Sequence, residues 1–191
     1  MSVLTVIGGD GVDTEVLEVI GEVLEPVFKL ESIGYGRFVE SEERYVWGRE
    51  QYDSAGLLRD LIRELPRGRG RVLGVTGLDL CTPILTFVFG QAQLSGPAAI
   101  VSLARLRQEF YGFEPDPGLF LARLCKESTH EVGHTFGLVH CQDRECAMSL
   151  STSIAEVDRK NIGLCRRCRE TVRRLRGGSD GRSGAAGGSH E

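Results

Sequence analysis

The sequence predicts an α+β fold, and three features of the chain lead to that expectation. The 191 residues are enough for one domain with an adequate core. Strand-like and helical segments follow one another in an order that fits a mixed layout better than a repeated βαβ unit. They lead into one long helix, predicted over residues 117–136. The formal net charge of −4 is too small to indicate a polyanionic partner for the whole chain.

The N-terminal segment is predicted to form a strand followed by a helix. Ser2 to Ile7 are mostly apolar and end at Gly8-Gly9, and a helix is expected from about Asp13 to Leu24. Glycines at such a junction can bind a dinucleotide phosphate. Here the G-x-G-x-x-G spacing is incomplete, because Thr14 stands where the last glycine is needed. We therefore expect no nucleotide site.

The middle of the chain supplies one more helix and three strands. Asp53-Ser54 can cap a helix whose apolar residues have helical spacing: Leu57, Leu58, Leu61 and Ile62. Arg71 to Val75 is predicted to be a buried strand. Thr86 to Gln93 alternates less cleanly, which indicates an edge strand, and Ala98 to Leu103 follows it.

The long helix has a clear beginning and a predicted buried face. Asp116 is a good N-cap residue, and Pro117 suits the first helical position. With His130 as the reference direction, one set of residues projects to the opposite side and should be buried in the core: Leu121, Leu124, Cys125, Ser128, Val132 and Phe136.

Three of the four histidines lie close together near the end of this helix, with the spacing of an open zinc site. His130 and His134 are one turn apart on the same face, so both imidazoles can reach one ion. Glu131 projects about 100° away, where its carboxylate can take a proton from a water on the metal. Gly137 can end the helix in the left-handed conformation and return His140 as a third ligand. The alternative is a chance cluster, which the helical context makes less favourable.

Four of the six cysteines follow the histidines: Cys141, Cys146, Cys165 and Cys168. They form one C-x-x-C pair and one slightly wider pair, and both spacings are common for structural zinc. Four thiolates leave zinc no open position, so this site would hold folded a segment too small to bury much core.

Other uses of these cysteines fit the sequence less well. Disulfides are disfavoured because Met1 to Thr5 show no secretory signal, so a cytoplasmic protein is expected. Haem attachment would need a histidine where Arg169 stands. A redox pair remains a weak alternative. The other two cysteines, Cys81 and Cys125, are expected to be buried as small hydrophobic residues.

The run from His130 to His140, followed by the four cysteines and by Met148, resembles the archaemetzincins, a branch of the metzincin zinc metalloproteases. The resemblance implies a metzincin-like mixed twisted sheet with backing and active-site helices. It also implies a small zinc-stabilised C-terminal subdomain and two zinc ions per chain, one catalytic and one structural.

Residue roles follow from the same resemblance. His130, His134 and His140 would bind the catalytic zinc, and Glu131 would be the general base and later the acid. Cys141, Cys146, Cys165 and Cys168 would bind the structural zinc, and Met148 would lie in the turn beneath the metal. Some metzincins carry a tyrosine soon after this methionine, whereas all four tyrosines of this chain lie upstream. The group that stabilises the oxyanion is therefore unassigned.

Two functions are weighed. The main expectation is a monomeric cytoplasmic zinc metallopeptidase or aminopeptidase without a membrane segment, which cleaves peptide or protein substrates with a zinc-held water activated by Glu131. An extended substrate could lie along Thr86–Gln93, although an ordinary sheet strand fits that segment equally well. The alternative is a non-catalytic zinc-binding protein with a basic C-terminal helix for nucleic acid. That helix would carry Arg166, Arg167, Arg169, Arg173, Arg174 and Arg176, but the acidic remainder of the chain makes nucleic acid an unfavoured partner.

One domain is expected over residues 1–176, with an upper part at about 1–137 and a lower part at about 138–176. Residues 177–191 are rich in glycine and are predicted to be a flexible tail, which contains His190.

Overall fold

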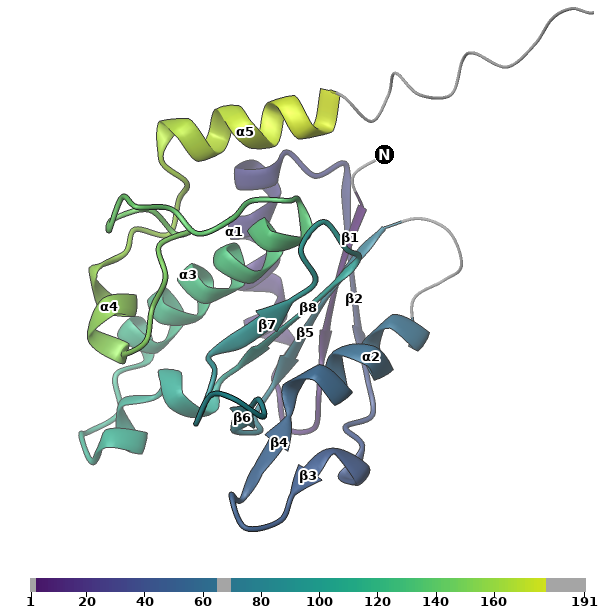
Figure 1. Cartoon of the computed structure of the whole chain (residues 1–191), viewed down its shortest axis with the longest axis vertical. Coiled ribbons are helices and arrows are strands. Elements are labelled where there is room, and N and C mark those ends of the chain that lie inside the picture. The colour runs from purple at the N-terminus through teal and green to yellow at the C-terminus, as the bar shows by residue number, and fades with distance from the viewer. Residues whose placement is uncertain (1–2, 65–69, 178–191) are drawn as a thin grey trace, which may run out of the picture.

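The computed structural model describes residues 3–64 and 70–177, and a five-stranded sheet with helices on both faces forms its centre (Figure 1). The strands are β1 (Val3–Gly8), β2 (Ser32–Arg37), β3 (Tyr45–Val46), β4 (Gln51–Asp53), β5 (Arg71–Thr76), β6 (Leu80–Cys81), β7 (Gly90–Ala92) and β8 (Ala98–Ser102). The α-helices are α1 (Thr14–Phe28), α2 (Ser54–Glu64), α3 (Pro117–Thr135), α4 (Ile154–Arg159) and α5 (Arg166–Gly177). The predicted tail falls outside the described residues from residue 178 onward.

The main sheet is mixed, as the resemblance implies. Its strand order is β2-β1-β5-β8-β7, and only the pairing of β7 with β8 is antiparallel. β1, α1 and β2 form one βαβ unit. β3, β4 and β6 make a small second sheet. The α+β class with a mixed sheet is confirmed.

The predicted strand at Thr86–Gln93 is longer than the observed one, which covers only Gly90–Ala92. The chain leaves the main sheet before Phe89, because the backbone N–H of Val88 donates to the carbonyl of Leu80 instead of pairing with β8. The expectation that this strand lies at the edge of the sheet is confirmed. As a result, β7 and the preceding loop face a cleft.

Alternating residues of the central strands pack into two separate hydrophobic cores. In β1, Leu4 and Val6 join the core beneath α1 and α3, whereas Ile7 joins the core beneath α2. This period of two is what a strand with helices on both faces requires. Figure 1 shows α2 on the opposite face of the sheet from α1 and α3. The first core continues into the C-terminal segment through Met148 and Val172.

Tertiary contacts extend α1 beyond its predicted end at Leu24. The helix continues through Pro26 to Phe28, whose ring stacks on that of Phe136 at a centroid distance of 4.9 Å. Leu24 and Phe28 are both fully buried. Burial of two large apolar side chains stabilises the last turn by several kcal/mol, on the order of 2 kcal/mol each.

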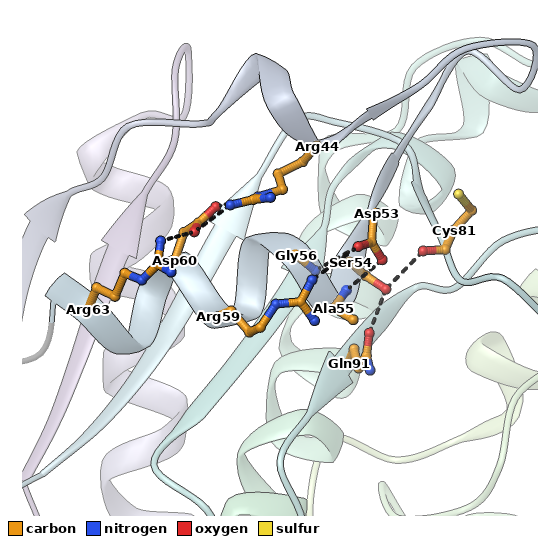
Figure 2. Close-up of polar contacts among 10 residues, drawn as sticks. All are labelled: Arg44, Asp53, Ser54, Ala55, Gly56, Arg59, Asp60, Arg63, Cys81 and Gln91. Carbon is orange, nitrogen blue, oxygen red and sulfur yellow. Dashed lines mark hydrogen bonds and ion pairs between the residues drawn. The ribbon is translucent and has the colours of Figure 1, made fainter.

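The predicted cap of α2 is confirmed (Figure 2). The Asp53 carboxylate accepts hydrogen bonds from the backbone N–H groups of Ala55 and Gly56, at 3.2 and 3.0 Å. On the next residue, the Ser54 hydroxyl lies between the carbonyl of Cys81 and the side chain of Gln91 in β7. The beginning of α2 is therefore hydrogen-bonded to β7, the strand that faces the cleft. Among the described residues, no helix is both long and apolar enough to cross a membrane.

Candidate active site

Helix α3 carries His130 and His134, and both of its ends lie where the capping residues in the sequence indicate. The Asp116 carboxylate accepts from the N–H of Leu119 at 2.9 Å, with Pro117 at the first helical position. At the other end, Gly137 has φ of +88°, and its N–H donates to the carbonyl of His134. A residue with a side chain would be strained there. The predicted helix stop at this glycine is confirmed.

The predicted core face of α3 is confirmed. Leu124, Val132 and the rest of the predicted core face are buried, apart from the half-buried Leu121. The ligand face is buried as well: His130 and Glu131 are each only 5% exposed. The reason is that residues after Gly137 fold back over this face. The helix is therefore central to the molecule, a result that a helical wheel alone does not give.

The structure brings the three histidines together. Their candidate ligand atoms all lie within 4.8 Å of one another. Nδ1 of His130 faces the carbonyl of Ala147 at 2.8 Å, and Nδ1 of His134 faces that of Leu138 at 2.7 Å. Because a carbonyl only accepts, each Nδ1 carries the proton and each Nε2 presents a lone pair. The two Nε2 atoms are 3.1 Å apart.

This arrangement fits zinc. Two lone pairs that face each other repel unless a proton or a metal ion lies between them. Burial lowers the pKa of all three histidines, and the positive charge of Lys160 lowers it further, so the protonated forms are disfavoured. Backbone carbonyls that fix the tautomer are the usual support of zinc-bound imidazole. Three neutral imidazoles on one side also leave a coordination position free.

Glu131 lies beside the histidines and not among the groups that converge as ligands. Its carboxyl is buried, and burial raises its pKa well above the usual value, with a further contribution from Glu127. A divalent cation at the histidines would favour the carboxylate form instead. The position suits a group that exchanges a proton next to the metal.

Met148 lies beneath the site, as the resemblance implies. It is fully buried, and its Sδ atom fills the space that a side chain on Gly133 would need. Gly133 therefore lets the turn containing Met148 press against α3 between the two histidines. The carbonyl of the neighbouring Ala147 is the acceptor for His130.

Two ion pairs of α3, of which only Lys160–Glu127 is buried on both sides, have no counterpart among the sequence predictions. Lys160 Nζ is 2.9 Å from Glu127, with side-chain exposures of 1% and 4%, and 3.5 Å from Nδ1 of His130. The guanidinium of Arg123 makes two bonds to Asp158, at 2.6 and 2.7 Å. Both pairs join α3 to the segment around α4. The only signal in the sequence is a charged residue at each of positions 123 and 127 of a helix that is predicted to have a buried face.

The cysteines form a second cluster. The sulfur atoms of Cys141, Cys146, Cys165 and Cys168 lie within 4.8 Å of one another. Burial raises the pKa of Cys168, and nearby Cys146 raises it further. Four crowded thiols of this kind release protons when a divalent metal binds. The other two cysteines, Cys81 and Cys125, are buried elsewhere, as predicted.

A cleft of about 740 Å³ opens over the histidines. One wall is the segment before and along β7, including Thr86, Phe87 and Gln91. Leu150 and Thr152 belong to the other lining residues. No tyrosine lines this cleft among the described residues, so the oxyanion stabiliser stays unassigned. The wall coincides with the predicted substrate strand, although pairing with a substrate stays a prediction.

Comparison with known proteins gives consistent matches. The model of peptidase family M54 matches residues 37–174. An archaemetzincin of Methanopyrus kandleri is 51% identical over 133 residues, which are 70% of this chain and 72% of the relative. One from Archaeoglobus fulgidus is 36% identical over 162 residues, which are 85% and 94% of the two chains.

Solved structures agree with these matches. The crystal structure of the Methanopyrus kandleri archaemetzincin has a TM-score of 0.82 at 41% identity, covering 92% of this chain and 95% of that one. A zinc-dependent peptidase from Methanocorpusculum labreanum has a TM-score of 0.78 at 29% identity, covering 88% and 99%. The rival expectation of a non-catalytic zinc-binding protein is not favoured. With most of its length matched by the family model and by these relatives, the chain belongs to peptidase family M54, the archaemetzincins, and is a zinc-dependent metallopeptidase.

Proposed function

We propose that His130, His134 and His140 hold the catalytic zinc and that Glu131 is the general base of peptide hydrolysis. One observation carries the proposal: both helical imidazoles have Nδ1 committed to backbone carbonyls, so their Nε2 atoms converge on a point shared with His140. When bound there, zinc supplies a Lewis acid that acidifies water and polarises the scissile carbonyl.

The chain's own groups then perform the proton transfers. Glu131 accepts a proton on its carboxylate as water attacks the carbonyl, and it later donates that proton to the leaving amine. Its burial keeps bulk water from competing for the proton. The ring orientation of His130 and His134 is fixed by the carbonyls of Ala147 and Leu138.

We also propose a second, structural zinc in the cysteine cluster, which makes two zinc ions per chain. The support is the convergence of four sulfur atoms, which leaves no ligand position for substrate. Such thiols must stay reduced, which favours a cytoplasmic location. A monomer as the active form stays a prediction.

For the domain organisation, we propose a single catalytic domain over residues 1–176. Its upper part, to about residue 137, contains the sheet, and its lower part, about 138–176, contains the cysteine cluster. The common hydrophobic core that runs through both parts supports this division into parts of one domain.

Zinc counting tests the ligand assignment. Zinc per chain is measured by elemental mass spectrometry for the wild type, His134→Ala and Cys165→Ser, with Cys125→Ala as a buried thiol control outside the cluster. We expect about two ions in the wild type and the control, and close to one in His134→Ala. Full zinc in His134→Ala would show that the histidines do not hold a metal.

A further inference from the structure

Strand β7 lies against Glu131 at a residue that has no side chain. Gly90, the first residue of β7, lines the cleft together with Glu131. A Cβ atom placed on Gly90 would lie 2.7 Å from Cγ and 2.8 Å from Oε1 of Glu131, and 2.6 Å from the carbonyl oxygen of Ile100. Real Cβ atoms do not approach other heavy atoms this closely, so any side chain at this position requires a displacement.

Backbone conformation does not explain the glycine. The φ angle of Gly90 lies outside the left-handed region, so a residue with a side chain could adopt this backbone without strain. A glycine within a strand that is not needed for its φ angle commonly marks the close approach of another group. Here two groups approach: the carbonyl of Ile100 in the paired strand β8 and the buried side chain of Glu131.

Strand β7 is held in place and cannot easily move away from Glu131. On one edge, Gly90 and Ala92 pair with Val101 and Ala99 of β8. On the face toward α2, the Ser54 hydroxyl donates to Gln91 Oε1 at 2.5 Å (Figure 2). The carboxylate of Glu131 is therefore the movable partner of the contact, and a side chain at position 90 would push it away from its place beside the histidines.

We propose that Gly90 is a positioning residue for Glu131. Because Gly90 has no side chain, the carboxylate of the general base can lie directly against the backbone of β7. The inference rests on the proposed role of Glu131 in the reaction. It adds that β7 determines where the carboxylate of Glu131 lies. The contact itself is a steric one and exists whatever Glu131 does chemically.

The kinetic test uses zinc-loaded, full-length Gly90→Ala with Gly34→Ala as the matched control. Gly34 is also a strand glycine, but the nearest atoms to an added Cβ are 3.7 Å away. We expect kcat of Gly90→Ala to fall about 10²-fold, as for a misplaced catalytic group, with KM within about threefold and zinc content unchanged. Gly34→Ala should match the wild type. Full kcat in Gly90→Ala would overturn the proposal.

A stability cycle separates the contact from the chemistry. The thermal midpoint is measured for the wild type, Gly90→Ala, Glu131→Ala and the double variant. We expect Gly90→Ala to lower Tm by on the order of 5 °C when Glu131 is present. In the Glu131→Ala background, the same substitution should lower Tm by less than half as much. An equal loss in both backgrounds would place the clash at Ile100 and overturn the proposal.

The two measurements also distinguish this proposal from the catalytic one. Glu131 variants could keep their activity while the stability cycle shows coupling between positions 90 and 131. That result would contradict the role of Glu131 as general base but would support the contact between Gly90 and Glu131. If Gly90→Ala does not fold, the double variant decides, because truncation of Glu131 should restore folding. A double variant that also fails to fold contradicts the proposal.

Discussion

At the scale of single residues, the histidine site depends on groups that are far away in the sequence. Lys160 is the clearest case: its ammonium lies buried between Glu127 and the ring of His130. Thirty-three positions separate Lys160 from Glu127, so no local pattern predicts the pair. Without Lys160, the buried Glu127 carboxyl would have no hydrogen-bonded cation among the described residues.

Removal of the Lys160 charge should therefore be costly. Lys160→Met keeps much of the side-chain volume but leaves Glu127 unpaired in the interior, and breaking a buried pair in this way costs about 3–5 kcal/mol. Arg166→Ala, which breaks the exposed pair with Glu170, is the control and should cost less than about 1 kcal/mol. Urea unfolding of zinc-loaded proteins measures both. Similar losses for the two variants would mean that Lys160 and Glu127 are not paired in solution.

At the scale of elements, the turn after α3 connects the two candidate metal sites. His140 and Cys141 are adjacent in the chain, and the N–H of Cys141 donates to the carbonyl of Met148 at 2.8 Å. Ala147, one residue earlier, supplies the carbonyl that orients His130. The cysteine cluster therefore holds the same short segment that carries the third histidine and supports the first.

Loss of a cysteine ligand should consequently weaken the histidine site. We expect Cys168→Ser to lose the structural zinc and to bind the remaining zinc at least 10-fold more weakly, because His140 is no longer held in place. Competition with a chromophoric chelator measures that affinity, and Cys125→Ala should bind like the wild type. If Cys168→Ser kept wild-type affinity at the histidines, the two sites would be independent.

Helix α2 offers a pH-dependent contact at the same scale. The Arg44 guanidinium donates to both oxygens of Asp60, at 2.7 and 2.9 Å, which fastens the segment before β3 to α2 (Figure 2). The hydrogen bonds from Arg44 lower the pKa of Asp60 below its usual value. The contact therefore stabilises the fold above the unfolded-state pKa, about 3.9, and this stability is lost as the pH falls through the lower folded-state pKa.

Asp60→Asn removes that titration. The variant should be less stable than the wild type at neutral pH, and the difference should shrink steadily as the pH falls below about 4. Urea midpoints measured between neutral and acidic pH supply the test. A difference that is the same at every pH would show that the Asp60 charge does not contribute.

The sequence predicts those features whose cause is local. The caps at Asp53 and Asp116, the stop at Gly137 and the histidine and cysteine spacings all act within a few residues, and the structure confirms the caps and the stop and brings both ligand sets together. The short strand at Gly90–Ala92 and the buried ligand face of α3 depend on distant segments. For Gly90, a lone glycine in a predicted strand was the available signal of a close approach. That nucleic acid is an unfavoured partner of α5 stays a prediction.

At the scale of the whole molecule, one hydrophobic core extends from β1 and α1 through α3 to the cysteine cluster. The sheet, the histidines and the lower segment therefore belong to one packed unit, with the cleft between the β7 wall and the turn beyond Met148. This continuity explains why the ligand face of α3 is buried while the cleft above it remains open to a peptide.

The assignment of Glu131 as general base is tested most directly by peptide hydrolysis with zinc-loaded Glu131→Gln. The amide keeps the size of the side chain and cannot accept the proton, so we expect about two zinc ions per chain and kcat lower by about 10²–10⁴-fold. Glu18→Gln, an exposed glutamate on α1, is the control and should keep wild-type turnover. Wild-type turnover by Glu131→Gln at full zinc content would contradict the assignment.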